Sequence, residues 1–182
     1  MFSKYSKYIY NYDQGVLSRI DLMKQLSQVS PIFPKLQFAI QEKTIRQYSE
    51  PIKSLKWPEE KNSIEKLWHD FTQEIVRMHN YGYVHGDILK KNIVFDGCRL
   101  RLIDHELSLV IGTELRVTFP WVASEDFIQK QISEKTDLIC LKAMRLRLFE
   151  YEKYREFRVL QTELITNTIK SNDLSSNKRN LH

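Results

Sequence analysis

The residue types with the most chemistry lie between His85 and Asp104. Asp87 and Asn92 are five positions apart in the segment His-Gly-Asp-Ile-Leu-Lys-Lys-Asn, and Asp104 follows the next two apolar runs. A phosphoryl-transfer site has this layout: one carboxylate accepts a hydroxyl proton, while an amide and a second carboxylate hold Mg²⁺ on the phosphates of ATP. Such a reaction needs little covalent help, so catalysis depends on positioning and on neutralisation of charge.

The spacing of Asp87 and Asn92 lets one loop present both side chains to one pocket. Mg²⁺ prefers hard oxygen ligands, and two from the protein are sufficient when phosphates and waters supply the rest. An isolated Asp and Asn in a loop more often only cap turns. Here a helical pattern precedes the pair and a hairpin pattern separates it from Asp104, so the whole string favours a site.

The elements that must position these residues are a helix and a hairpin. Residues 63–79 carry apolar side chains at helical spacing, and Asn62 with Glu65 resembles a capping box at the helix start. Residues 92–95 and 99–103 are predicted strands joined around Asp96-Gly97, which is a strong hairpin signal.

The N-terminal part of the chain has short elements. Alternating residues predict a strand over 5–12, and apolar spacing predicts an amphipathic helix over 16–29. Two further short strands are predicted over 36–40 and 44–48. Residues 49–61 are polar and contain prolines, and we expect them to form a hinge between two lobes.

The C-terminal part is predicted to be mainly helical. Residues 105–124 show no regular pattern, residues 137–170 carry a helical pattern, and residues 171–182 are expected to be a disordered polar tail.

Composition indicates a folded, soluble, cytoplasmic protein. Of 182 residues, 42% are hydrophobic and 12% aromatic, which excludes a disordered chain. No run approaches the roughly 18 apolar residues of a membrane span, and Cys98 and Cys140 have no metal-ligand spacing. The net charge of +5 and pI near 9.1 indicate a moderately basic, solvated surface. Nucleic acid is a less favoured partner than protein, because no zinc-binding, helix-turn-helix or RNA-binding signature is present.

The string from His85 to Asp104 resembles the catalytic loop, hairpin and metal-binding motif of protein-kinase-like phosphotransferases. The kinase loop pattern is a His, any residue, an Asp, four residues and an Asn. The resemblance implies Asp87 as the catalytic base and His85 as a brace of the loop. It also implies that Asn92 and Asp104 bind Mg²⁺ and the nucleotide, with ATP and Mg²⁺ as cofactors.

Two later segments resemble the same family. Residues 118–125 are similar to the end of a kinase activation segment, with Glu125 at the position of its closing Glu. Residues 133–139 are similar to the start of the long central helix, and the resemblance implies that Asp137 holds the catalytic-loop backbone through hydrogen bonds.

Some positions depart from the protein-kinase pattern. Gly86 replaces the Arg of many regulated protein kinases, which argues against control by an activation-loop phosphate. Leu89 stands where protein-serine kinases carry a phosphate-contacting Lys, and the adjacent Lys90 is the candidate for that catalytic role. His105-Glu106 replaces a Phe-Gly pair, and an acidic residue there is more familiar from small-molecule and atypical kinases.

The front of the chain has no room for the Gly-rich strand-turn-strand that precedes the ATP-binding Lys in kinases. Lys7, or else Lys4, is the candidate phosphate-binding residue, and Asp21 is the only acidic residue in the following predicted helix. We therefore expect a kinase-like α+β fold. It would have a reduced N-terminal lobe without the Gly-rich loop over residues 1–52 and a mainly helical lobe over residues 53–170.

The leading functional hypothesis is an ATP-dependent phosphotransferase with a protein Ser/Thr acceptor. A small-molecule acceptor is one alternative. A second is a catalytically impaired binding module, which a partner protein would complete. A metal-dependent phosphohydrolase using Asp104-His105 with His85 and His69-Asp70 is disfavoured, because Asp104-His105 follows a predicted strand.

Overall fold

The computed structural model describes residues 6–11, 14–41, 44–50, 52–104, 109–114 and 123–179. Strands and one helix form an N-terminal unit: β1 (Ser6–Asn11), α1 (Gln14–Val29), β2 (Leu36–Gln41) and β3 (Thr44–Ser49). The following unit is mainly helical and has short strands: α2 (Lys61–Asn80), β4 (Tyr83–Val84), the 3₁₀ turn η1 (Lys90–Asn92), β5 (Ile93–Phe95), β6 (Leu100–Leu102), β7 (Leu109–Val110), α3 (Ser124–Gln129), α4 (Glu134–Phe149) and α5 (Tyr151–Arg179).

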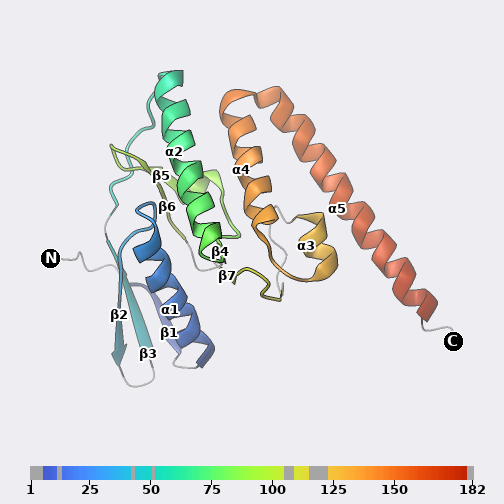
Figure 1. The fold of residues 1–182 in the computed structure, drawn as a ribbon, viewed down its shortest axis with the longest axis horizontal. Helices are drawn as coiled ribbons and strands as arrows, with labels where there is room; N and C mark the ends of the chain where they lie inside the picture. The colour runs from blue at the N-terminus through green and yellow to red at the C-terminus, as the bar shows by residue number, and fades with distance from the viewer. Residues whose placement is uncertain are drawn as a thin grey trace.

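The N-terminal unit is an antiparallel sheet in the order β1-β3-β2, with α1 beside it (Figure 1). The hairpin of β2 and β3 pairs Gln41 with Thr44 at its tip, so β2 extends one residue beyond the predicted strand. The predicted strands and helix of this unit are confirmed to within two residues. Lys7 lies on β1 at an irregularity of the pairing with β3, between Ser6 and Tyr8.

In the second unit, α2, α4 and α5 are the long helices (Figure 1). The chain reverses after α4, so that α5 packs against α4 and then continues past it. Residues 171–179, expected as a polar tail, continue α5 instead, because extending a formed helix adds one hydrogen bond per residue without a new nucleus. Within the described residues, no helix combines the length and the apolar composition of a membrane span.

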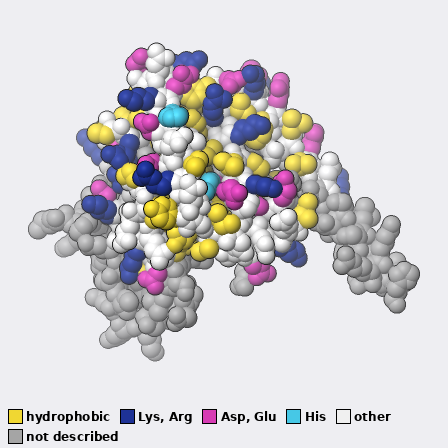
Figure 2. All heavy atoms as spheres, in the orientation of Figure 1, with side chains coloured by type: hydrophobic (Ala, Val, Ile, Leu, Met, Phe, Trp, Pro, Cys, Tyr) yellow, Lys and Arg dark blue, Asp and Glu magenta, His cyan; other side chains and the backbone are white. Residues whose placement is uncertain are grey.

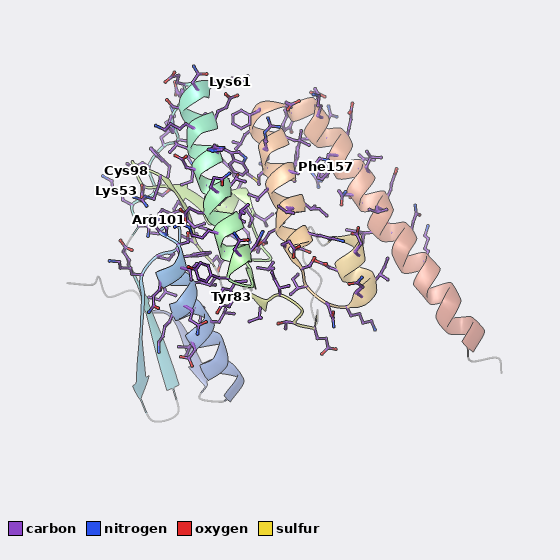
Figure 3. All side chains as sticks on the ribbon, viewed as in Figure 1. Lys53, Lys61, Tyr83, Cys98, Arg101 and Phe157 are labelled. Atoms are coloured by element: carbon purple, nitrogen blue, oxygen red, sulfur yellow. The ribbon has the colours of Figure 1, made fainter. Side chains whose placement is uncertain are left out.

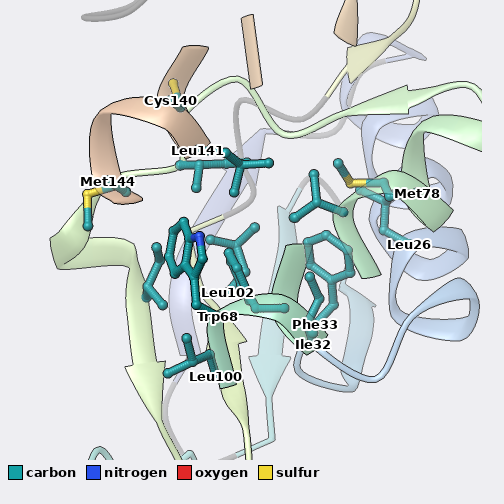
Figure 4. Close-up of a cluster of buried hydrophobic side chains, with 14 residues drawn as sticks. Leu26, Ile32, Phe33, Trp68, Met78, Leu100, Leu102, Cys140, Leu141 and Met144 are labelled. Carbon is teal, nitrogen blue, oxygen red and sulfur yellow. The ribbon is translucent and has the colours of Figure 1, made fainter. Parts of the chain in front are cut away.

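One hydrophobic core joins the two units (Figure 4). Fully buried side chains from the end of α1 and the segment after it pack against α2, β6 and α4. Each fully buried Leu, Ile or Phe contributes about 1.5–3 kcal/mol to the stability of the fold. Hydrophobic packing therefore holds the N-terminal unit against the second unit, in addition to the covalent connection between them. The labelled members are Leu26, Ile32, Phe33, Trp68, Met78, Leu100, Leu102, Cys140, Leu141 and Met144.

The start of α2 differs from the prediction. The helix begins at Lys61, and Glu60 is its N-cap residue. Asn62 therefore lies inside the first turn and cannot cap the helix with Glu65. Instead, Ser63 Oγ donates a hydrogen bond of 2.7 Å to Glu60 Oε2, which ties the cap residue to the first turn.

Arg101 on β6 connects the two units (Figure 3). Its Nη2 donates to the carbonyl oxygen of Phe33 at 3.0 Å and to Glu50 Oε2 at 3.2 Å, and its Nη1 donates to Asp96 Oδ2 at 3.3 Å. The Arg101 side chain is only 12% exposed. A hydrogen bond from the Lys35 backbone and the Arg101 charge lower the pKa of Glu50 against the effect of its partial burial. The guanidinium therefore holds the segment after α1, the segment after β3 and the hairpin turn together.

Arg101→Met is expected to lower the free energy of unfolding by about 2–3 kcal/mol. Breaking a buried ion pair costs about 3–5 kcal/mol, and the figure is discounted because the Glu50 side chain is 35% exposed. Urea unfolding followed by tryptophan fluorescence measures this loss. Arg99→Met is the matched control, because Arg99 is an exposed arginine of the same hairpin. Equal urea midpoints for the two variants would show that Arg101 does not tie the units.

The contacts of Arg101 with Asp96 and Glu50 also predict how the stability difference between wild type and Arg101→Met depends on pH. Burial raises the pKa of Asp96, but hydrogen bonds from the Arg99 and Cys98 backbone and from Arg101 outweigh it and lower that pKa, as the pKa of Glu50 is lowered. A carboxyl group whose pKa is lower in the folded state stabilises the fold above its unfolded pKa of about 4 and loses that stabilisation as the pH falls. The stability difference between wild type and Arg101→Met should therefore shrink below about pH 4.

Candidate active site

Asp137 on α4 anchors the loop between β4 and η1 through hydrogen bonds. The fully buried carboxylate of Asp137 accepts hydrogen bonds of 2.8 Å from the backbone N–H groups of both His85 and Gly86. A third contact joins Asp137 Oδ2 to His79 Nε2 at 3.0 Å. The predicted contact of Asp137 with the loop backbone is confirmed. Gly86 has a φ of +80°, which strains any residue with a side chain, so the backbone itself favours glycine there.

The side chain of His85, which belongs to this loop, is fully buried. Its ring is stacked on Phe33, with centroids 6.3 Å apart and planes inclined by 15°. Burial lowers the pKa of His85, although the nearby charges of Asp137, Asp87 and Asp104 oppose this. The backbone N–H of Asp87 donates to Nδ1 at 3.1 Å, so the proton of the neutral ring is on Nε2. The His85 ring thus accepts a hydrogen bond from the loop backbone, and its role as a brace stays a prediction.

Asp87 and Asn92 are held together directly. The Nδ2 group of Asn92 donates to the carbonyl oxygen of Asp87 at 2.9 Å and to its carboxylate Oδ2 at 2.8 Å. The Asp87 residue is 7% exposed, so its carboxylate is largely fixed within the loop. Since both Nδ2 contacts are made with Asp87, the carbonyl oxygen Oδ1 is the Asn92 atom with the chemistry to bind a cation.

Asp104 is placed beside this pair by the β5–β6 hairpin. The backbone N–H of Ile103 donates to the carbonyl oxygen of Asn92 at 2.8 Å, which brings the next residue to the end of η1. Asp104 has a φ of +64°, an uncommon backbone conformation for a residue other than glycine. The negative charges of Asp87 and Asp104 both raise the pKa of His85 against the larger effect of its burial.

This donor set fits Mg²⁺ better than a metal held by protein alone. An amide oxygen from Asn92 and a carboxylate from Asp104 are hard oxygen ligands, and Mg²⁺ usually keeps waters and phosphate oxygens as its other ligands. Across the described ranges, no group of three or more His, Cys, Asp or Glu side chains is arranged to hold a metal ion.

The two lysines of η1 point to different neighbours. Lys90, the predicted catalytic lysine, has its Nζ 3.7 Å from the centre of the Trp57 ring. Lys91, which is not among the predicted site residues, has its Nζ 3.8 Å from Asp87 Oδ2. Its position four residues after Asp87 is the only sequence signal for this contact.

The remaining predicted residues are not part of the site as the structure describes it. The side chain of Lys7 is outside the described part of the structure, as are Lys4 and His105-Glu106, so their roles stay predictions. Glu125 on α3 forms an ion pair with Lys135 at 3.7 Å.

Comparison with solved structures identifies the fold as kinase-like. The kinase PK-1 of Cydia pomonella granulovirus superposes with a TM-score of 0.57 at 17% sequence identity, over 73% of this chain and 56% of the viral chain. At this identity the likeness shows the fold alone, and the present chain spans little more than half of the viral kinase chain. No protein-family model matches the sequence, and the comparison with curated proteins gave no match.

Proposed function

We propose that this chain is an ATP-dependent phosphotransferase with a protein Ser/Thr hydroxyl as acceptor. The observation that supports the proposal most is the pairing of Asp87 with Asn92 on a loop that Asp137 anchors by two backbone hydrogen bonds. If Asp87 and Asn92 only capped turns, the loop would not need the additional hydrogen bonds from Asp137 on α4. The kinase-like fold supports the same class of reaction.

In the proposed reaction, Asp87 accepts the proton of the acceptor hydroxyl. The acceptor oxygen forms a bond to the γ-phosphorus as the bond from that phosphorus to the leaving oxygen of ADP breaks. Mg²⁺, bound with ATP, would neutralise charge on the phosphate oxygens. Asn92 Oδ1 and the Asp104 carboxylate would hold the cation, and Lys7 on β1 is proposed to contact the phosphates. Lys90 is the proposed phosphate-contacting lysine of the catalytic loop, because it is adjacent to Leu89.

A binding module without transferase activity is the second candidate. The described N-terminal sheet has three strands, in the order β1-β3-β2. In this alternative, a partner protein would supply the Gly-rich loop over the phosphates. A small-molecule acceptor is the remaining alternative, favoured by Gly86 and Glu106.

Binding of Mg²⁺ and ATP is expected to raise the melting temperature by about 5–10 °C. A ligand at ~100 times its Kd adds about 2.7 kcal/mol, and 1 kcal/mol moves the melting point of a chain of this size by about 2–4 °C. The shift should require Mg²⁺ and should be lost in Asp104→Ala, because that variant lacks the carboxylate ligand. Thermal unfolding with ATP, with ATP and Mg²⁺, and with neither measures it.

Asp70→Ala is the control for this experiment, since Asp70 is an exposed carboxylate on α2. It should keep the full shift. A shift that is the same in EDTA, or that survives in Asp104→Ala, would remove Asp104 from the site. No shift at millimolar ATP would favour the binding module.

A further inference from the structure

A cavity of about 360 Å³ lies between the end of the catalytic loop and the two helices α4 and α5. Its volume is in the range of small-molecule and side-chain pockets. The charged side chains that line it all carry a positive charge, and the remaining wall is mostly apolar. The lining residues are Ile88, Leu89, Lys90, Lys91, Cys140, Ala143, Met144, Arg147 and Tyr154.

Two of these cations rest on aromatic rings instead of carboxylates. Lys90 Nζ lies over the Trp57 ring at 3.7 Å, and the Arg147 guanidinium lies 5.9 Å from the centre of the Tyr154 ring. Among the described residues, no carboxylate forms an ion pair with either. Burial lowers the pKa of Lys90, and the charge of Arg147 lowers it further. Lys90 and Arg147 thus carry like charges in a cavity whose lining residues include no carboxylate.

The face of the molecule shown in Figure 2 has a mixed pattern of charges. On the face shown in Figure 2, Lys and Arg side chains are interspersed with Asp and Glu side chains. Arg145, two positions before Arg147 on α4, forms an ion pair with Glu150 at 3.7 Å. The absence of a carboxylate partner thus distinguishes Lys90 and Arg147 in this cavity from Arg145 on the same helix as Arg147.

The cavity also adjoins the proposed catalytic carboxylate. Lys91 lines the cavity and has its Nζ 3.8 Å from Asp87 Oδ2. An acceptor with its hydroxyl at Asp87 would therefore place a neighbouring group at Lys91 and, beyond it, at Lys90 and Arg147.

We infer that this cavity binds an acidic side chain of a peptide acceptor, next to the Ser or Thr that is phosphorylated. The inference rests on the proposed function only in assigning the hydroxyl to Asp87. Carboxylates suit Lys90 and Arg147, which have no carboxylate partner among the described residues, and the apolar wall suits the methylene groups of a Glu side chain. A nucleic-acid backbone needs an extended basic surface. A small cavity with an apolar wall, in a protein whose visible face carries interspersed positive and negative side chains, fits a peptide better.

The test is binding of a fluorescein-labelled peptide with one Ser flanked by Glu residues, against a peptide with Gln in place of each Glu. Fluorescence anisotropy at low salt, without ATP, should show the acidic peptide binding about tenfold more tightly, which corresponds to one charge-assisted contact. Arg147→Gln should remove most of this preference. Arg145→Gln removes an equal charge from the same helix outside the cavity and should keep the preference.

Equal affinity for the two peptides, or equal losses in Arg147→Gln and Arg145→Gln, would overturn the inference. Tighter binding of a single-stranded oligonucleotide, lost in Arg147→Gln, would replace the peptide by a nucleic acid. Because the assay contains no ATP, a chain that binds the acidic peptide but transfers no phosphate would contradict only the proposed function. Transfer to the Gln peptide at the rate of the Glu peptide would contradict only the acidic preference.

Discussion

Replacing Asp137 with alanine is expected to lower the free energy of unfolding by about 3–5 kcal/mol, the largest stability loss among the changes considered. The Asp137 carboxylate is fully buried and accepts from the backbone N–H groups of His85 and Gly86 and from the ring of His79. Each buried donor left without an acceptor costs about 1–3 kcal/mol, and the Asp137 carboxylate is the acceptor that the structure supplies to all three groups. Urea unfolding measures the loss.

Asp137→Asn keeps the test informative if the alanine variant does not fold. The amide retains one acceptor oxygen, but its NH₂ group would face a backbone donor, so we expect an intermediate loss. Hydrogen exchange at the His85 and Gly86 amides should speed up in this variant more than exchange in the N-terminal sheet does. Leu138→Ala, at an exposed position of the same helix, should change stability little. A loss in Asp137→Asn no greater than in Leu138→Ala would show that the anchor does not stabilise the loop.

Local periodicity was enough to predict much of the fold. The hairpin of β2 and β3 and the helices α1 and α2 follow from short-range spacing of apolar residues, which a single sequence contains in full. The two-residue strands β4 and β7 were not predicted, because two residues are too few to show alternation. The kinase-like arrangement of the second unit followed from the motif resemblance, and the fold comparison supports it.

Contacts between distant segments were harder to predict. Arg101 lies between Leu100 and Leu102, so alternation along a strand predicts an exposed side chain for it. Its burial depends on Phe33 and Glu50, which only the packed fold brings within hydrogen-bonding distance.

In the candidate site, too, some features could be predicted from local sequence and others depend on the folded structure. The positions of Asp87, Asn92 and Asp104 followed from spacing, because a loop and a hairpin fix them locally. Which adjacent lysine faces Asp87 depends on the turn of η1, and the structure places Lys91 there and Lys90 over Trp57.

Asp87→Asn is expected to lower the rate of phosphoryl transfer to the acidic Ser peptide by about 10²–10⁴-fold, the usual contribution of a general base. The amide has nearly the shape of the carboxylate, and its oxygen can still accept the hydrogen bond from Asn92 Nδ2. It cannot accept a proton from the acceptor hydroxyl. The melting-temperature shift with Mg²⁺ and ATP should therefore be kept, so that nucleotide binding and transfer are separated in one variant.

The measurement is transfer of radiolabelled phosphate from ATP to the peptide, with Asp70→Asn as the control carboxylate on α2. Asp70 is exposed and has no contact with the catalytic loop in the described structure, so its variant should transfer at the wild-type rate. An unchanged rate in Asp87→Asn would mean that the hydroxyl loses its proton elsewhere, and the base assignment would fail. If wild type binds Mg²⁺ and ATP but transfers nothing, the fixed Asp87–Asn92 pair serves nucleotide binding alone, and the chain acts as a binding module.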